Sequence, residues 1–450
     1  MPTDVASLLK APLSRILHAL AAGEASARDL VEAALVGVEA GPANAWAHLD
    51  AAAARSAADR SDARRARGEA LGRLDGVPVA VMDCFDVEGM PTGLGLPASG
   101  AMPAAEDAAA VGRLRGAGTV VLGKTAMDEA GFGTLGVNPH GGAVDNPALP
   151  DRVSGGAGSG AAATVAAGQV PFALAADTLG SARIPAAFCG VVGLRPTWGE
   201  ASRVGMAAAM RRLDVPALVG RHAGDLILPL QLISGYDARD VASRARRVPF
   251  APPDWDPTAL RVGRVADLRS LGASPDAVEA FGRALEAAGP TLGHARPVSL
   301  DLAALEVAAC RRAALLLMEA DLLAAHGARL DAVSAPLAAL LGFARSRSAV
   351  DAMAAEQRLD ALVVAVRELF ERFDLLVLPT VPAAPPVRGE PEPPNLADFT
   401  ALASLAGCPA LSLPLPEGHG LQLVGPRGSD LRLLEVGGIV QSVVEASLGE

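Results

Sequence analysis

The chain has 450 residues, of which 51% are hydrophobic, and its formal net charge at pH 7 is −11. This length allows up to three domains, although large α/β enzymes often form a single unit of this size. The apolar content is enough for a sizeable buried core. The negative charge, which no long block of Lys or Arg offsets, argues against nucleic acid or an anionic membrane as the main partner.

Cysteine spacing and the N-terminal residues bear on the cellular compartment. The four cysteines are widely scattered and form no C-x-x-C pair, so we expect neither a metal site nor a disulfide framework, and a cytoplasmic location. The first 20 residues carry charges throughout and predict an amphipathic helix rather than a signal peptide. The longest uncharged stretch, residues 153–176, contains five glycines, Gln169 and Pro171. It predicts a buried helix entered from a loop rather than a membrane span.

The first half of the chain predicts helices followed by buried strands. Residues 1–70 are Ala-rich and helical in pattern, and Ser26 with Asp29 three residues later marks one helix start. The apolar run 74–83 opens on Asp-Gly and predicts a strand. A helix then leads into a second strand at 119–125, and a third strand is predicted at 170–177.

The second half continues the alternation of strands and helices. Ser274 followed by Pro275 predicts the start of a helix. The remaining elements are strands at 260–267, 374–380, 409–415 and 420–426, and helices at 301–327, at 348–372 and from about 429. This order predicts an α/β fold with a mainly parallel or mixed sheet covered on both faces. We find no internal repeat and no linker that marks a domain boundary.

One apparent nucleotide motif is better explained as a strand. Residues 118–125 read Gly-Thr-Val-Val-Leu-Gly-Lys-Thr and match the P-loop pattern G-x-x-x-x-G-K-[ST]. In a P-loop the four variable residues form a turn whose backbone N–H groups wrap phosphates. Thr-Val-Val-Leu is apolar and β-branched, so we expect a strand here and no phosphate site.

The glycine-rich segment 154–168 has two general interpretations. Its spacing is similar to a dinucleotide-binding fingerprint, but that fingerprint must directly follow a strand. Here the preceding residues are DNPALPDRV, a loop broken by prolines. The simpler interpretation is a close approach of backbone that leads into a buried helix of small residues.

Together with the residues that follow, this segment resembles the amidase signature. Residues 154–199 read SGGAGSGAAATVAAGQVPFALAADTLGSARIPAAFCGVVGLRPTWG. The family has a Gly-Gly-Ser-Ser-Gly-Gly-Ser run, a small-residue helix, Asp-Thr-Gly-Gly-Ser-x-Arg-x-Pro-Ala, and a Cys-Gly-x-x-Gly-Leu-(Lys/Arg)-Pro-Thr end. Segments 74–92, 123–156, 374–386 and 407–425 resemble further parts of the family. The resemblance implies one amidase-signature domain over residues 1–450, with a large mixed twisted sheet covered by helices on both faces.

The resemblance also implies a serine mechanism, for which this chain lacks two groups. In the family a serine attacks the amide carbonyl, and a second serine, held on a cis peptide bond, passes its proton to a neutral lysine. A serine hydroxyl needs such a base to become a nucleophile. Ser181 matches the nucleophile, whereas Met82 stands at the lysine position and Ala157 at the cis-serine position. A methionine cannot act as a base, and a methyl group cannot relay a proton.

The oxyanion turn and the glycine-rich loop are partly kept. Leu179 replaces the first glycine of the family's Gly-Gly-Ser, although the backbone of the turn can still offer N–H donors. The residues that match the family's oxyanion turn are Thr178, Leu179 and Gly180, and those that match its glycine-rich loop are Gly155, Gly156, Gly158 and Ser159. Losing a general base lowers a rate by about 10²–10⁴-fold, and losing one oxyanion donor by roughly 10²–10³-fold. We therefore expect hydrolysis by the family's route to be close to absent. Ser181 is then interpreted as a hydroxyl that caps the turn into a helix.

No other residue is an evident replacement for the base. Cys84 points to the same side of its strand as Met82, but no histidine is near it in sequence, so we expect packing. His140 lies in a segment that the family also has, and we expect a structural role. Ser154 and Ser159 could approach the nucleophile, yet neither supplies a base.

These residues leave three hypotheses. The leading one is a degenerate amidase homologue that binds a small amide or carboxylate, or serves as a homodimer or partner subunit of an active enzyme. The second is a working amidohydrolase of small linear amides with a site rearranged around Ser181. The third is a non-hydrolytic enzyme that uses the same cleft. No metal or organic cofactor is implied, and we expect Met82 and Ala157 to line the cleft floor beside Ser181.

Overall fold

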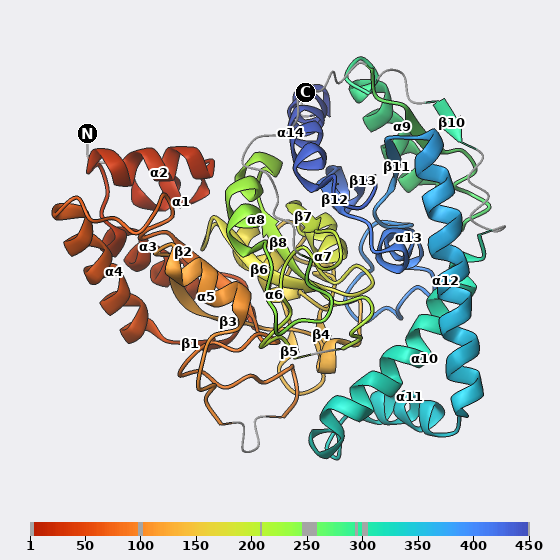
Figure 1. Ribbon diagram of the computed structural model, residues 1–450. Coiled ribbons are helices and arrows are strands. Elements are labelled where there is room, and N and C mark those ends of the chain that lie inside the picture. The colour runs from red at the N-terminus through yellow and green to blue at the C-terminus, as the bar shows by residue number, and fades with distance from the viewer. Residues whose placement is uncertain are drawn as a thin grey trace.

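The computed structural model describes residues 4–97, 102–207, 209–244, 259–292, 296–298 and 305–448. At its centre, eleven strands of these ranges form one sheet in the order β1-β3-β2-β6-β8-β7-β12-β13-β11-β9-β10 (Figure 1). Their bounds are Trp46–Leu49 (β1), Pro78–Met82 (β2), Val120–Thr125 (β3), Phe172–Asp177 (β6), Val192–Arg195 (β7), Val215–Gly220 (β8), Val262–Val265 (β9), Arg296–Val298 (β10), Leu375–Pro379 (β11), Ala410–Pro414 (β12) and Gly420–Val424 (β13). A separate pair joins β4 (Val137–Asn138) to β5 (Gly142–Ala143).

The sheet is mixed, as the sequence predicts. Strand β2 pairs in parallel with β3 and β6, and β9 pairs in parallel with β10 and β11. The strands between these two groups pair antiparallel, from β6 through β8, β7, β12 and β13 to β11. Strands β2, β3 and β6 are buried along their whole length, which is why each reads as an unbroken apolar run. The P-loop-like residues are therefore a strand.

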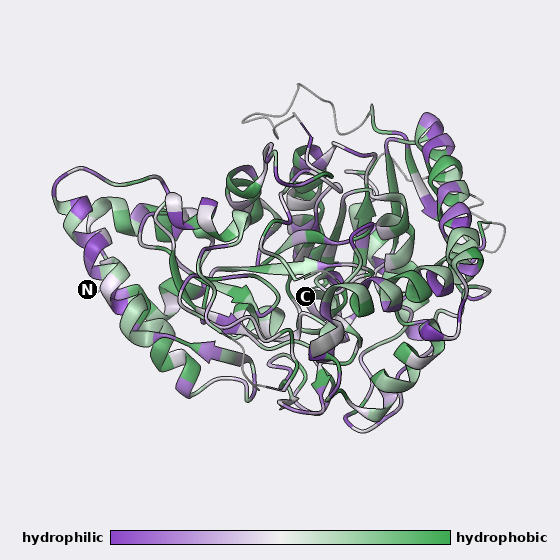
Figure 2. Ribbon diagram, turned by 60° about the horizontal axis from the view of Figure 1, so that its bottom comes forward, coloured by the Kyte–Doolittle hydropathy of each residue, from purple (hydrophilic) through white to green (hydrophobic). Residues whose placement is uncertain are grey.

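Helices cover the sheet and account for the remaining predicted elements. Their bounds are Val5–Lys10 (α1), Leu13–Ala22 (α2), Ala27–Glu39 (α3), Ala51–Ala66 (α4), Ala109–Gly116 (α5), Ser159–Ala166 (α6), Arg183–Phe188 (α7), Ile227–Ile233 (α8), Pro275–Ala288 (α9), Val307–His326 (α10), Ala335–Arg345 (α11), Ala349–Arg372 (α12), Asp398–Ala406 (α13) and Asp430–Leu448 (α14). Ser26 and Asp29 form the predicted capping box of α3, and Ser274 caps α9. Figure 2 shows apolar residues on the central strands and many polar residues on the outlying helices and loops.

Several elements differ from the sequence predictions. The amphipathic N-terminal segment forms two helices, because Pro12 cannot continue α1 and instead precedes α2. Helix α11 and strands β1, β7 and β8 were not predicted. Of the predicted helix 301–327, the first four residues lie outside the described part of the chain. No helix in the described ranges has the length and apolar character needed to cross a membrane.

Helix α10 packs against α11 and against α12, and the three helices extend to one side of the sheet (Figure 1). Helix α10 also packs on α13. This arrangement brings α10 and α11 over the carboxyl end of β6, where the signature segment turns into α7.

Candidate functional site

The turn between β6 and α7 presents Ser181 and is fixed by a buried carboxylate. Asp177, at the end of β6, accepts a hydrogen bond from the Gly180 N–H at 3.0 Å. The Arg183 guanidinium donates to the same carboxylate at 2.8 and 2.9 Å, and Arg195 pairs with it at 3.3 Å. Burial alone raises the pKa of Asp177, but the two arginines hold that pKa below its usual value. The carboxylate stays ionised and locks the turn.

Gly180 and Leu179 occupy this turn in different ways. Gly180 has φ +128°, and a Cβ added there would lie 2.4 Å from Thr400 Oγ1, so a side chain does not fit. The Thr400 hydroxyl donates to the Leu179 carbonyl at 2.6 Å. Leu179 is half-buried, and its side chain lines the cavity in front of Ser181. Leu179 does not adopt a left-handed backbone conformation, so a leucine is tolerated at this position of the turn.

The glycine-rich loop is bonded to this turn. The Gly158 N–H donates to the Ser181 carbonyl at 2.9 Å, and the Asp128 N–H donates to the Ala157 carbonyl at 3.2 Å. The Gly156–Ala157 peptide bond is cis. Helix α6 begins at Ser159, so the loop connects the site to a fully buried helix of small residues, as the sequence predicts.

Met82, Ala157 and Ser181 come together around Gly158. A Cβ added at Gly158 would lie 2.6 Å from Ser181 O and 3.7 Å from Met82 Sδ. Met82 is 1% exposed and accepts a 3.3 Å contact from the Ala176 N–H. Met82 and Ala157 thus lie beside the Ser181 turn as expected, but both side chains are buried and neither is among the residues that line the cavity.

No lysine of the chain lies near Ser181. The sequence contains two lysines, Lys10 and Lys124. Lys124 is fully buried on β3, pairs with Asp83 at 3.0 Å and donates to the Pro91 carbonyl at 2.8 Å. It is the register partner of Val81, so it lies on the face of the sheet opposite to Met82. Lys10 lies in α1, against the Gly168 end of α6.

Several ionisable or nucleophilic groups near the cavity are engaged or buried. Glu129 accepts hydrogen bonds from the Ser334 N–H at 2.8 Å and pairs with His140 Nε2 at 2.6 Å. His140 therefore holds a loop, in agreement with the structural role predicted for it. Cys84 is buried, and burial raises the pKa of its thiol. Ser154 and Ser159 are buried with hydroxyls that have no partner within the described ranges.

Asp128 is a site residue that the sequence did not single out. It is buried, one oxygen accepts from the Gly136 N–H at 3.2 Å, and the other has no partner in the described part of the chain. Burial raises the pKa of Asp128 to about 8. A Cβ added at Gly156 would lie 2.3 Å from this carboxyl group, so a largely protonated acid backs the loop at neutral pH.

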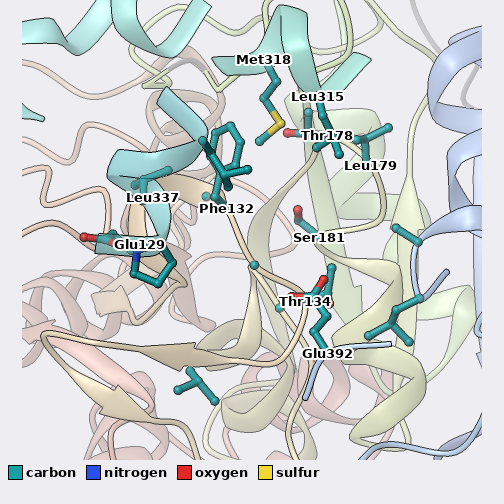
Figure 3. A pocket seen from close by; sticks show the side chains of 18 of the residues that line it. Glu129, Phe132, Thr134, Thr178, Leu179, Ser181, Leu315, Met318, Leu337 and Glu392 are labelled. Atoms are coloured by element: carbon teal, nitrogen blue, oxygen red, sulfur yellow. The ribbon is translucent and has the colours of Figure 1, made fainter. Parts of the chain in front are cut away.

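Ser181 faces a cavity of about 470 Å³, which we call the Ser181 cavity. The turn contributes Thr178, Leu179 and Ser181 to its lining (Figure 3), and the loop contributes Gly156. Apolar side chains from other elements form much of the remainder: Phe132, Ile184, Leu315, Met318, Leu337, Leu340 and Leu396. Its polar lining outside the turn includes Glu129, Thr134, Arg311, Ser334 and Glu392.

Thr178 connects the cavity to a second buried acid. Its hydroxyl donates to Asp214 Oδ1 at 2.7 Å, and the Ala209 and Met210 N–H groups donate to the other oxygen at 2.9 and 2.8 Å. Burial raises the pKa of Asp214 to about 6.

The contributions of α10, α11 and residue 392 come from outside the signature, and the sequence held no signal that placed them near Ser181.

Comparison with known proteins identifies the relatives of this chain. The family model described as Amidase matches residues 29–434. A subunit of the glutamyl-tRNA(Gln) amidotransferase from Thermobifida fusca (strain YX) is 33% identical over 98% of this chain and 97% of its own length. The corresponding subunit from Anaeromyxobacter sp. (strain K) is 42% identical, but over 58% of this chain and 54% of the relative.

Solved structures show the same fold. One is described as a vestigial protein complex that reveals the evolutionary origins of an s-triazine catabolic enzyme. Its chain superposes with a TM-score of 0.86 at 30% identity, over 96% of this chain and 98% of that one. The agreement therefore extends over nearly the whole of both chains.

Proposed function

Since the chain belongs to the Amidase family, we propose that it is a member that binds a small ligand in the Ser181 cavity without hydrolysing amides by a Ser–Ser–Lys route. The observation that carries this proposal is the absence of an amine base. The two lysines of the sequence are on the far face of the sheet and in α1. Met82, which matches the family's lysine in the sequence, is buried, and its sulfur accepts a contact from the Ala176 N–H.

The ionisable groups around the cavity support the same proposal. Glu129 is occupied by Ser334 and His140. Asp128 lies behind the loop, is not among the described residues that line the cavity, and is mainly protonated at neutral pH. Ala157 offers no hydroxyl to carry a proton from Ser181.

A ligand-binding role is favoured by what the site retains. Ser181 lies at the wall of a formed cavity of about 470 Å³. It is held there by the hydrogen bond from Gly180 to the Asp177 carboxylate and by the hydrogen bond from the glycine-rich loop to the Ser181 carbonyl. Pockets of this size with mostly apolar walls and a few polar groups are typical of small-molecule sites. We infer that the whole chain acts as one domain, whose eleven-stranded sheet in the described ranges spans both halves of the sequence.

We also propose that the protein acts as a homodimer or as a partner subunit in the cytoplasm. Two observations support this role in an assembly: the Thermobifida fusca relative is named as a subunit, and the solved relative belongs to a protein complex. The four cysteines are buried and unpaired, which suits a reducing compartment.

The second candidate is an amidohydrolase of small linear amides that works from Ser181 with a different proton path. Ser181 is partly exposed to the cavity, and the turn that would hold an oxyanion is intact apart from Leu179. In this case a water molecule or the substrate itself would take the proton, because the family's base is missing.

An amidase assay on the purified full chain separates the two candidates. We expect ammonia release from octanamide and from aryl amides to stay at the level of the Ser181→Ala variant, because nothing activates the serine. Turnover at an ordinary enzyme rate that disappears in Ser181→Ala would contradict the proposal and favour the second candidate.

A further inference from the structure

The Ser181 cavity has an apolar end and a polar end. Leu315 and Met318 of α10 lie at one end, and Phe132 and Leu337 extend this apolar surface (Figure 3). Glu392 and Thr134 lie at the other end, with Ser181 between the two (Figure 3). An elongated ligand with one polar terminus matches this distribution.

The positive charge among the residues that line the cavity is already paired with an acidic side chain. Arg311 is the one basic residue among the described residues that line the cavity. Its Nε donates to Asp398 Oδ1 at 2.5 Å and its Nη2 donates to the Pro394 carbonyl at 2.7 Å. The guanidinium therefore offers little positive charge to a carboxylate ligand.

The carboxylate at the polar end is not neutralised. Glu392 is exposed, and no ion pair or hydrogen bond joins it to another residue of the described ranges. Glu129, the other acid of the lining, uses its oxygens on Ser334 and on His140. Leaving Arg311 aside, the charge that a ligand meets beside Ser181 is negative. A cleft with one sign of charge and apolar walls concentrates ligands of the opposite sign.

We propose that the Ser181 cavity selects an elongated apolar primary amine over a carboxylate of the same length, with the ammonium group against Glu392 and the apolar chain against α10 and α11. This inference rests on the proposed function, because the ligand occupies the same cavity. It assigns Glu392 as the residue that determines ligand charge and does not favour the carboxylate alternative raised by the sequence.

A binding series with one chain length tests this assignment. Octylamine, octanamide and octanoate share the same apolar chain and differ in charge, and their binding to the full chain is measured by isothermal titration calorimetry at low ionic strength. We expect octylamine to bind more tightly than octanoate by roughly tenfold or more, which is about 1.4 kcal/mol or more for reversing a charge near a carboxylate. The ratio should shrink as salt is raised.

Two variants distinguish a local effect of Glu392 on ligand binding from an effect of the protein's net charge. Glu392→Gln should bring the octylamine and octanoate affinities to within about threefold. Glu279→Gln removes the same charge from an exposed position on α9, none of whose residues lines the cavity, and should leave the ratio unchanged.

The outcomes distinguish this inference from the proposed function. Equal or tighter binding of octanoate by the natural chain, or a ratio that Glu392→Gln does not change, overturns the charge selection and leaves amide binding intact. Binding of none of the three compounds overturns the inference. Hydrolysis of octanamide contradicts the proposed function alone, because octylamine has no amide bond and its affinity still reports the charge preference.

Discussion

Met82 and Ser181 approach each other across Gly158, which leaves no room for a side chain: a Cβ at this glycine would lie 3.7 Å from Met82 Sδ and 2.6 Å from the Ser181 carbonyl oxygen. A group at the end of residue 82 is therefore aimed at the nucleophile's turn. Under the proposed function, this contact accounts for how a change at one residue of a buried strand removes a base without disturbing the cavity.

This geometry predicts the result of restoring the family's residues. The triple variant Met82→Lys, Ala157→Ser, Leu179→Gly should hydrolyse an activated aryl ester on the order of ten- to a hundredfold above background, and amides hardly at all. This is at the low end of what a general base supplies, because the helices around the cavity are not matched to the change. The measurement is ester hydrolysis, and adding Ser181→Ala to the same triple variant is the control. Ester hydrolysis that persists in the control would mean that the rate does not pass through Ser181.

The single variant Met82→Lys gives a pH prediction. Burial favours the neutral amine, so the lysine's pKa in the folded protein should fall below its value in the unfolded chain. The unfolded state then binds more protons at neutral pH, and the free energy of unfolding should rise with pH until it passes the unfolded pKa. Urea unfolding at pH 7 and pH 10, with Met82→Leu as the matched control, measures this. A pH dependence identical in both variants would show that residue 82 is solvated.

Asp128 predicts a pH dependence with the opposite sign. Because burial raises its pKa to about 8, the folded protein holds a proton that the unfolded chain has already lost above about pH 4. The free energy of unfolding should therefore fall with rising pH between these two values, by roughly 2–4 kcal/mol from pH 5 to pH 8. Asp128→Asn should lose this dependence, whereas Asp151→Asn, at an exposed position, should keep it. Parallel pH profiles for Asp128→Asn and the natural chain would contradict the assignment.

Lys124 should matter for stability and not for chemistry. Lys124→Met leaves the buried Asp83 carboxylate without its 3.0 Å partner, and removing one partner of a buried pair lowers stability by about 3–5 kcal/mol. Chemical denaturation measures the loss. The double variant Lys124→Met, Asp83→Leu should recover part of it, because the unpaired charge is gone. No recovery would mean that the hydrogen bonds to Pro91 and Thr92 dominate the effect.

Gly180 predicts a local steric effect in the turn. Gly180→Ala places a Cβ 2.4 Å from Thr400 Oγ1 at φ +128°, so the free energy of unfolding should fall by about 1–3 kcal/mol. Thr400→Ala in the same chain should restore only a part, since the backbone strain remains. Gly282→Ala, in α9 where nothing lies within 4 Å of the added carbon, is the matched control and should be neutral or stabilising.

The parts of the fold that the sequence predicted are those where local pattern and burial agree. Strands β2, β3 and β6 are buried on both faces and read as apolar runs. Helices α3 and α9 carry their own caps. Strand β1 lies at the edge of the sheet with alternate residues exposed, so its four residues gave too short a signal.

The sequence predicted only those site residues that lie within one contiguous segment or within the family resemblance. The turn at Ser181 and the loop at Ala157 follow from one contiguous segment, and the family resemblance supplied Met82. Arg311 and Glu392 join the cavity from more than 100 residues away. Their placement depends on how α10 packs against α11 and α13, and no local pattern encodes that packing. Asp128 was missed because its unusual environment is a matter of burial.

The scarcity of lysine leaves this chain few sites for amine-directed labelling. Apart from the α-amino group, Lys10 is the only lysine with solvent access, because Lys124 has none. A succinimidyl dye should therefore attach at the α-amino group and at Lys10 of α1, and the label on α1 should report the binding of a ligand or of a partner protein by fluorescence. In the Met82→Lys variant the same reagent becomes a probe of the site itself, since modification at residue 82 would show how often the loop over Gly158 opens.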